Sequence, residues 1–338
     1  MLEELLSAPT KRRRLIAAAA AELGTEPADM LVSAGTEAVV LTSMLAGELR
    51  LPMAYLRPKP KTHGRQQRVE GELRGAHIVL IAANAEPEAI RDYTELVAAN
   101  GGQVSRVLVA KMLPSPAAAG EGQGEGAHPH PSLSRKRERN RDVARILLDI
   151  GAVIIRQEPF RYASGLLSPI YTDCRLLISH PEQWQAVLEG LAAKLRGATF
   201  DAIDGVATSG IPHASVLAYR LDKPLAYVGD GAIAGAPAKS SQLVIVEDLV
   251  TTGKSVLEAT NILRANGMRV DRCFAIFTYD RRQPSLEAAG VAFEPLSDLA
   301  TLLEVGLAAG CFGPTERDAV LAWRRDPQDW TARHPLSC

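Results

Sequence analysis

The stretch Val244-Ile-Val-Glu247-Asp248-Leu-Val-Thr251-Thr252-Gly253-Lys254-Ser255 gives the clearest indication of how this chain of 338 residues folds. An apolar run suited to a buried strand leads into two acids, then into a loop of small hydroxyl residues and glycine, and then into a helix start. Backbone N–H groups at a helix N-terminus, together with such hydroxyls, form a cradle for an anion such as phosphate. An ordinary strand, turn and Ser-capped helix is the alternative, but adjacent carboxylates ending a buried strand are costly without a ligand. We therefore predict an anion-binding loop, with Glu247 and Asp248 placed to bind hydroxyl groups or Mg²⁺.

Strands and helices alternate on both sides of this loop. Before residue 112 we expect strands at 30–33, 53–56, 77–82 and 104–111, and helices at about 10–24, 36–49 and 86–100. After residue 141 we expect a helix, a strand-rich segment to Leu177 and a helix to about residue 195. Strands at 203–207, 225–228, 243–246 and 270–278 then follow, with a loop between the second and third of them and helices between the others. The last stretch, 316–330, is expected to form a helix followed by a turn at Asp326-Pro327. Short apolar strands that alternate with helices are typical of α/β folds with parallel sheets.

The two halves of the chain repeat each other. Leu51-Pro-Met-Ala-Tyr-Leu aligns with Lys223-Pro-Leu-Ala-Tyr-Val, and Asn100-Gly-Gly-Gln-Val aligns with Asn266-Gly-Met-Arg-Val. Between the halves, residues 113–141 combine prolines, a Gly/Glu/Ala tract and a basic run, which cannot bury enough apolar surface to offset their ordering entropy. We predict two tandem α/β domains, 1–112 and 142–338, joined by a flexible linker at 113–141. Its histidines and basic run could bind a metal or RNA, but solvated linker residues are the simpler interpretation.

The composition argues against several classes of function. A formal net charge of −1 leaves no electrostatic footprint for nucleic acid or an anionic membrane, and no stretch reaches the length of a membrane span. The basic residues 11–14 precede a short alanine-rich run that ends at Glu22, which favours a surface helix over a signal peptide. Four widely spaced cysteines, without a CxxC pair, favour packed thiols in a reducing cytoplasm over a zinc site, a disulfide framework or a nucleophile. They are Cys174, Cys273, Cys311 and Cys338.

Several segments of the second half resemble those of one enzyme family. The 244–255 motif resembles the signature with which type I phosphoribosyltransferases bind phosphoribosyl pyrophosphate (PRPP). Residues 160–175, Phe160-Arg-Tyr-Ala-Ser-Gly-Leu-Leu-Ser-Pro-Ile-Tyr-Thr-Asp-Cys-Arg175, are similar to the hood of the orotate phosphoribosyltransferases, and residues 205–214 to their pyrophosphate loop. Arg281, in Tyr279-Asp280-Arg281, matches the position where that family places an arginine on the orotate carboxylate, which a planar guanidinium suits.

The resemblance implies roles for individual residues. PRPP would be bound by residues of the motif and of the pyrophosphate loop: Glu247, Asp248, Thr251, Thr252, Gly253, Lys254, Ser255, Thr208, Ser209 and Gly210. The base would be bound by Ser164, Gly165, Tyr171 and Arg281. Mg²⁺ would be held mainly through PRPP, with Asp248 as a further ligand or as a group that handles a proton.

One part of the family pattern is missing from the second half and present in the first. Residues 229–241 keep Lys239 as their one basic residue and lack the Arg and His-Gly of the family's mobile catalytic loop, whereas Arg57-Pro-Lys-Pro-Lys61-Thr-His63-Gly64 resembles that loop. Conversely, the first half has no hood, and residues 79–86 lack the acids, threonines and glycine of the PRPP motif. In the family, one subunit's loop reaches into its partner's site. We therefore predict an intramolecular pseudo-dimer with one composite site, to which the first half supplies Arg57, Lys61 and His63. The alternative is a decayed repeat whose basic loop is solvated surface.

The reaction implied is the transfer of a phosphoribosyl group from PRPP to orotate, which yields orotidine 5′-phosphate and pyrophosphate in pyrimidine nucleotide biosynthesis. Three alternatives stay open: a transferase for another base such as a purine, a PRPP- or nucleotide-sensing regulator on the same fold, and an inactive scaffold. A homodimer of the whole chain also stays open. Trp323 and Trp330 are expected to pack in the interior and not to stack on a base.

Overall fold

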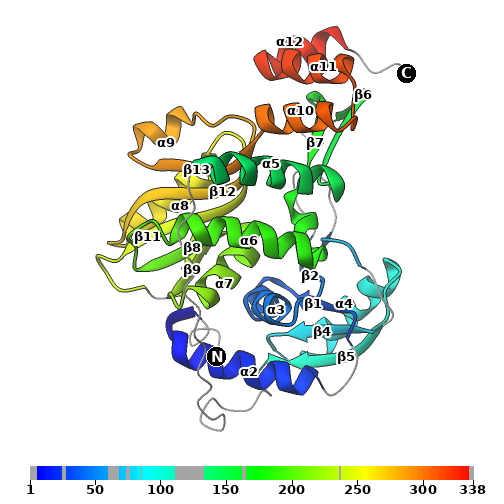
Figure 1. The fold of residues 1–338 in the computed structure, drawn as a ribbon. Coiled ribbons are helices and arrows are strands. Elements are labelled where there is room, and N and C mark those ends of the chain that lie inside the picture. Colours follow the sequence, from blue (N-terminus) through cyan, green and yellow to red (C-terminus); the bar gives the residue numbers. More distant parts are fainter. Residues whose placement is uncertain are drawn as a thin grey trace.

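The computed structural model describes residues 6–24, 28–59, 68–73, 77–84, 86–110, 133–161, 165–235 and 237–334. Within them the two halves of the chain each build a sheet of their own, and the sheets are flanked by helices (Figure 1). The predicted α/β class with two tandem units is confirmed. Among these residues, no helix is both long enough and apolar enough to cross a membrane.

The first half forms a five-stranded sheet in the order β3-β2-β1-β4-β5. Strands β2, β1, β4 and β5 are parallel, and the short edge strand β3 runs antiparallel to β2. The elements are α2 Pro9–Leu23, β1 Met30–Ala34, α3 Thr36–Leu49, β2 Met53–Leu56, β3 Val69–Glu70, β4 Ile78–Ala82, α4 Pro87–Ala99 and β5 Val104–Val109. The helices and parallel strands agree with the sequence prediction to within two residues or so at each end, whereas β3 was not predicted as a strand.

The second half forms a six-stranded sheet in the order β10-β9-β8-β11-β12-β13, of which only β10 is antiparallel. Its sheet and flanking elements are α5 Leu133–Asp149, α6 Pro181–Leu195, β8 Ala202–Val206, α7 Gly210–Arg220, β9 Leu225–Gly229, β10 Ala232–Ala234, β11 Gln242–Val250, α8 Lys254–Ala265, β12 Arg269–Thr278, α9 Pro284–Ala288, β13 Ala292–Asp298 and α10 Leu299–Ala308. Helix α5 begins at Leu133, so the basic end of the predicted linker is helical and not irregular.

A separate antiparallel hairpin forms the predicted hood. It consists of β6 Val153–Arg161 and β7 Leu167–Thr172, and the 3₁₀-helix η3 Cys174–Ser179 follows it. Helices α11 Pro314–Arg325 and α12 Pro327–Arg333 pack against the hairpin, at the end of the molecule away from the first half (Figure 1). Trp323 and Trp330 are 7% and 5% exposed, which confirms that they pack. Of the cysteines, Cys174 and Cys273 are buried, but Cys311 is exposed, so the prediction of a packed thiol is wrong for Cys311.

The two sheets share one topology. The order β3-β2-β1-β4-β5 of the first half corresponds, strand by strand, to β10-β9-β8-β11-β12 of the second, and in both the strand at the start of that order is antiparallel. The internal repeat seen in the sequence is therefore a repeat of structure. Helices α3 and α7 hold the same place in the two halves, because each follows the central strand β1 or β8 directly.

The halves join along this corresponding pair of helices. Helix α3 packs against α7, and every residue of 38–47 in α3 is buried. A Cβ atom on Gly47 would lie 3.0 Å from both methyl carbons of Val216, so the two backbones approach closely. Arg12 of α2, 1% exposed, donates hydrogen bonds to the carbonyl oxygens of Ala218 (2.9 Å) and Lys223 (2.7 Å) at the end of α7. Apolar residues of both halves belong to one continuous core.

Candidate active site

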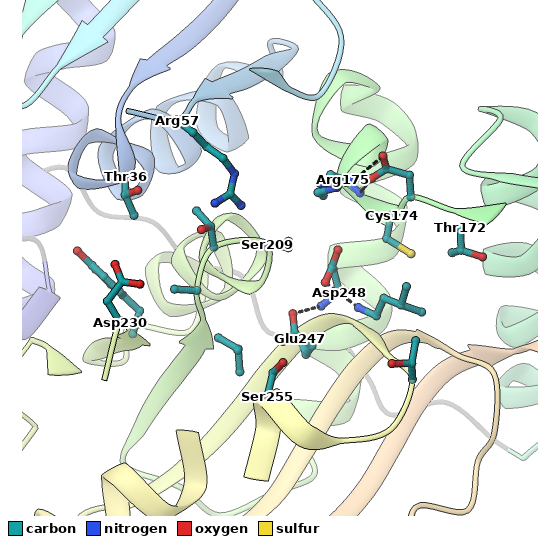
Figure 2. Close-up of a pocket in the computed structure, with 18 of the residues that line it drawn as sticks. Thr36, Arg57, Thr172, Cys174, Arg175, Ser209, Asp230, Glu247, Asp248 and Ser255 are labelled. Atoms are coloured by element: carbon teal, nitrogen blue, oxygen red, sulfur yellow. Dashed lines mark hydrogen bonds and ion pairs between the residues drawn. The ribbon is translucent and has the colours of Figure 1, made fainter. Parts of the chain in front are cut away.

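A cleft of about 900 Å³ opens between the halves at the carboxyl ends of the parallel strands of the second sheet (Figure 2). Parallel α/β sheets bind their ligands at this edge. The first half contributes Thr36, Arg57, Pro58 and Lys59 to the lining. The second half contributes Tyr171, Thr172, Asp173, Cys174, Arg175, Val206, Ala207, Thr208, Ser209, Tyr227, Gly229, Asp230, Glu247, Asp248, Leu249, Thr251 and Ser255.

Two adjacent carboxyl groups form the floor of the cleft. Glu247 and Asp248 lie in β11 and are 6% and 7% exposed. The backbone N–H of Asp248 donates to Glu247 Oε1 at 2.9 Å, and that of Leu249 donates to Asp248 Oδ1 at 2.8 Å. Burial, followed by the negative charge of Asp248, holds the pKa of Glu247 well above its usual range. Such a pair favours a ligand that brings hydroxyl groups or positive charge.

The predicted anion loop has the expected geometry. Residues 251–253 lead from β11 into α8, and Gly253 at the helix start has φ +74°, a left-handed conformation that glycine adopts without steric cost. A small recess beside the cleft is lined by residues 249–256 and Glu247. Lys254, Thr251, Thr252 and Ser255 line this recess, and the Lys254 side chain is 81% exposed, with its Nζ 3.8 Å from Glu258 Oε1. Backbone N–H groups at a helix N-terminus suit a phosphate.

A second loop enters the cleft at the N-terminus of α7. Thr208 and Ser209 line the cleft directly, and the peptide bond between Ala207 and Thr208 is cis. Gly210 begins the helix and lies close to β11, since a Cβ atom there would be 2.6 Å from the carbonyl oxygen of Val246. Only glycine allows this approach, which places the loop directly beside Glu247 and Asp248.

The first half closes the opposite side of the cleft. Figure 2 shows Arg57 extending from the first half toward Ser209, with Thr36 beside it. Arg57 Nε donates to Glu70 Oε1 at 2.7 Å. Lys59 also lines the cleft. Lys61 and His63, which the sequence predicts for the same loop, lie outside the described residues.

Arg175 carries the second guanidinium of the cleft. It follows the hood and binds Asp173 through Nε (2.5 Å) and Nη2 (2.6 Å), and its Nη1 pairs with Glu70 of the first half. Burial by itself would lower the pKa of Arg175, but the hydrogen bonds to Asp173 and the charges of Glu70 and Asp248 raise it. The hood and the first half are thus joined by charged groups inside the cleft.

Comparison with known proteins places this geometry in a family. No protein-family profile matches the chain. Orotate phosphoribosyltransferase of Coxiella burnetii (strain RSA 493 / Nine Mile phase I) is 40% identical to it over 202 residues, which make up 97% of that protein and 56% of this chain. The chain belongs to the orotate phosphoribosyltransferase family. Orotate phosphoribosyltransferase of Bacillus cereus (strain G9842) is 38% identical over 202 residues, 96% of its length and 56% of this chain.

One solved structure shares the fold over nearly the whole chain. The structure of Leishmania donovani UMP synthase covers 93% of this chain and 79% of its own, at 19% identity and a TM-score of 0.50. The curated orotate phosphoribosyltransferases, in contrast, match a length close to that of residues 142–338 alone. The tandem arrangement is therefore what distinguishes this member of the orotate phosphoribosyltransferase family from those relatives.

The base-binding residues expected from the orotate phosphoribosyltransferase family are only partly brought together. Tyr171 lines the cleft, and its hydroxyl donates to Asp173 Oδ2 at 3.4 Å. Gly165 is described, with φ +86°, but is not part of the lining, and Ser164 lies outside the described residues. Arg281 is 44% exposed, pairs with Asp298 and does not line the cleft.

Sequence reasoning missed several residues of the site. Asp173 and Arg175 fall inside the segment 160–175 that resembles the family's hood, but no role was assigned to them or to Glu70. The spacing Asp173-x-Arg175 directly after a strand-rich hood was the available signal, because a carboxylate and a guanidinium two residues apart readily pair. Lys59 also lines the cleft, and its place in the basic segment from Arg57 to Gly64 was the available signal; Thr36 and Asp230 line it too, and nothing in their local sequence marks them.

Proposed function

We propose that the chain is an orotate phosphoribosyltransferase with a single active site, located in the cleft between its halves. The observation that carries this proposal is the composition of the cleft. The PRPP motif and the pyrophosphate loop come from the second half, whereas Arg57 and Lys59 come from the first. In a family whose mobile loop serves a partner subunit, this arrangement makes residues 1–112 a built-in partner for residues 142–338. A homodimer of whole chains is not required by it.

Each part of PRPP has a matching group in the cleft. The 5′-phosphate would lie on the loop formed by residues 251–255, at the N-terminus of α8, where a helix offers backbone N–H groups to an anion. The ribose hydroxyls would donate to Glu247 and Asp248, which are buried and need such partners. The pyrophosphate would lie between the Thr208–Ser209 loop and Arg57, with Lys61 and His63 assigned to the same group from the sequence.

The reaction forms a bond between orotate N1 and C1 of the ribose while the bond from C1 to the pyrophosphate oxygen breaks. Positive charge develops on the ribose ring and negative charge on the leaving pyrophosphate. Arg57 and the basic residues that follow it would stabilise the leaving group electrostatically, as preorganised donors do for charge that develops in a transition state. Asp248 is the carboxylate that we assign to the proton released at N1. The hood, through Tyr171, would hold the base, and Arg281 would bind the orotate carboxylate after leaving Asp298.

The residues of the cleft fit Mg²⁺ bound together with PRPP. Within the described residues there is no cluster of three or more His, Cys, Asp or Glu side chains that could hold a metal alone. Mg²⁺ commonly uses one or two carboxylates together with substrate phosphates, and Asp248 supplies such a carboxylate at the floor of the cleft. When bound, Mg²⁺ would neutralise part of the pyrophosphate charge. We also propose the cytoplasm as the site of action, in keeping with the wide spacing of the cysteines.

The test is pyrophosphate release from PRPP and Mg²⁺ in the presence of orotate. We expect release by the intact chain and a loss of about 10²–10³-fold in turnover for Lys61→Ala, the magnitude typical of removing one preorganised charge-stabilising donor. Full activity of Lys61→Ala would mean that the chain is a transferase but that the basic loop of its first half takes no part in catalysis. A preference for uracil or a purine in an acceptor screen would replace orotate, and no release with any base would favour a sensor or a scaffold.

A further inference from the structure

A buried carboxylate of the first half joins the two guanidiniums of the cleft. Glu70 lies on β3, where it pairs across the sheet edge with Tyr55, and its side chain is only 5% exposed. A buried carboxylate is costly unless it is paired and hydrogen bonded. Glu70 meets this requirement with one oxygen for each arginine: Oε1 accepts from Arg57 of the first half, and Oε2 pairs with Arg175 of the second.

The two arginines differ in what remains available to a ligand. Arg175 uses Nε and Nη2 for Asp173 and Nη1 for Glu70, so all three of its nitrogens are engaged. Arg57 uses only Nε for Glu70, and among the described residues no acceptor binds its two Nη atoms. Figure 2 shows these atoms pointing into the cleft, on the side of Ser209. Arg175 is thus an anchor, and Arg57 is the arginine that can bind substrate.

The backbone of Arg57 is fixed as well. Its N–H donates to the carbonyl oxygen of Arg68 at 2.7 Å, and Arg68 Nε donates back to the carbonyl oxygen of Arg57 at 3.0 Å. With its backbone fixed, Arg57 could change position only through its side chain. Glu70 restricts that side chain as well, because its carboxylate accepts the hydrogen bond from Arg57 Nε. A guanidinium held at Nε presents its two terminal nitrogens in one plane, which suits two oxygens of a phosphate group.

We propose that Glu70 is a positioning residue for the pyrophosphate of PRPP, and that it acts through Arg57. The chain of contacts Asp173–Arg175–Glu70–Arg57 crosses from the hood to the first half, so Arg175 of the second half contacts the same carboxylate that holds Arg57. This inference rests on the proposed function, because it assigns the group that Arg57 meets. It adds that the two halves are coupled through one carboxylate, which contacts an arginine of each half.

The experiment compares Glu70→Gln with Glu72→Gln as the matched control. Glu72 follows the same strand and lies 3.8 Å from His180, but it does not line the cleft. We expect Glu70→Gln to lower kcat/KM for PRPP by about 10- to 100-fold, as for a misplaced substrate-binding group. It should weaken the binding of inorganic pyrophosphate, measured by calorimetry, and leave orotate binding unchanged. Glu72→Gln should behave as the wild type in all three measurements.

A double-mutant cycle separates positioning from a general structural effect. If Glu70 acts through Arg57, adding Glu70→Gln to Arg57→Ala should lower activity no further than Arg57→Ala alone. Fully multiplicative effects, or a Glu70→Gln variant with wild-type pyrophosphate affinity, would overturn the inference. If Arg57→Ala lowers transferase activity but Glu70→Gln does not, the composite site stands and only the positioning role of Glu70 is refuted. An intact chain without transferase activity would instead refute the proposed function.

A second variant keeps the inference testable if Glu70→Gln does not fold. Arg57→Lys retains the charge and leaves Glu70 in place, but a single ammonium cannot hold Glu70 and present a planar pair of donors at once. We expect it to raise KM for PRPP at least tenfold, with thermal unfolding unchanged. Wild-type kinetics for Arg57→Lys would show that a fixed fork is not needed, and the inference would be wrong.

Discussion

The contact between Gly47 of α3 and Val216 of α7 tests whether the halves form one rigid unit. In an isolated helix, Gly47→Ala would stabilise the protein by up to about 1 kcal/mol, because alanine loses less backbone entropy than glycine. In this structure the new methyl group would lie 3.0 Å from both Val216 methyl carbons, which is too close for an ordinary contact. Forcing additional volume into a packed interface costs about 1–3 kcal/mol. The net expectation for Gly47→Ala is therefore a destabilisation of about 0–2 kcal/mol.

The sign of this effect should depend on residue 216. Val216→Ala removes the two methyl groups that the new side chain meets, so in that background Gly47→Ala should become neutral or stabilising by up to about 1 kcal/mol. Urea denaturation of the four proteins of this cycle gives the required free energies of unfolding. We expect a single transition, because both halves contribute to one core. If Gly47→Ala stabilises the protein equally in both backgrounds, α3 and α7 do not pack as described, and the cleft between the halves loses its support.

Three further predictions concern the second half. Gly210→Ala should lower both stability and transferase activity, since its Cβ would lie 2.6 Å from the Val246 carbonyl oxygen. The control Gly197→Ala, whose Cβ would lie 3.4 Å from its nearest atom, should preserve both. Equal effects of the two substitutions would contradict the close approach at Gly210. Arg281→Ala should raise KM for orotate about 10- to 100-fold and leave KM for PRPP unchanged, as for a lost charge-assisted hydrogen bond; an unchanged KM for orotate would remove Arg281 from the base site. Asp204, fully buried in β8 without a hydrogen-bond partner among the described residues, has its pKa raised by burial to about 8. Because the folded state holds the Asp204 proton more tightly than the unfolded state, Asp204 stabilises the fold at pH values below its ordinary pKa. This contribution to the free energy of unfolding is lost as the pH rises to about 8, and the loss reaches about 4 kcal/mol at pH 7. Asp204→Asn should flatten the fall in stability between pH 4 and pH 8, and an unchanged slope in urea denaturation would show that Asp204 is not the cause.

The sequence predicted well what depends on neighbouring residues. The run from Val244 to Ser255 encodes a strand, an acid pair, a loop and a helix within one short segment, and each part has its expected form. Most helices and parallel strands were predicted with similar success, because apolar periodicity identifies elements that are several residues long. The parallel strand β13 and the helix α10 were nevertheless not predicted. The basic run before Asn140 was a further miss, since its charges suggested a linker although the segment continues into α5 as a single helix.

Features that depend on distant residues were not predictable in this way. The strand β3 has two residues, too few for any periodicity, and it exists because β2 offers an edge with which to pair. Glu70 meets Arg175 only when the hood of one half is placed against the sheet edge of the other. Arg281 was assigned to the base from the family pattern, but its ion pair with Asp298 holds it outside the cleft. Nothing in the sequence around Arg281 indicates that Asp298 will pair with it. Burial and long-range ion pairs are decided by the three-dimensional arrangement.

The complete burial of residues 38–47 in α3 bears on how the chain is synthesised. A helix surrounded on all sides by apolar partners has no face suited to water, and α7 supplies one of those partners. The first half leaves the ribosome before α7 is synthesised, so the apolar surface of α3 that packs against α7 stays exposed to water until the second half has folded. The segment between the halves then acts as a tether that keeps the local concentration of the partner high. Expression of residues 1–112 alone should accordingly give an aggregating product, and co-expression with residues 133–338 should restore its solubility.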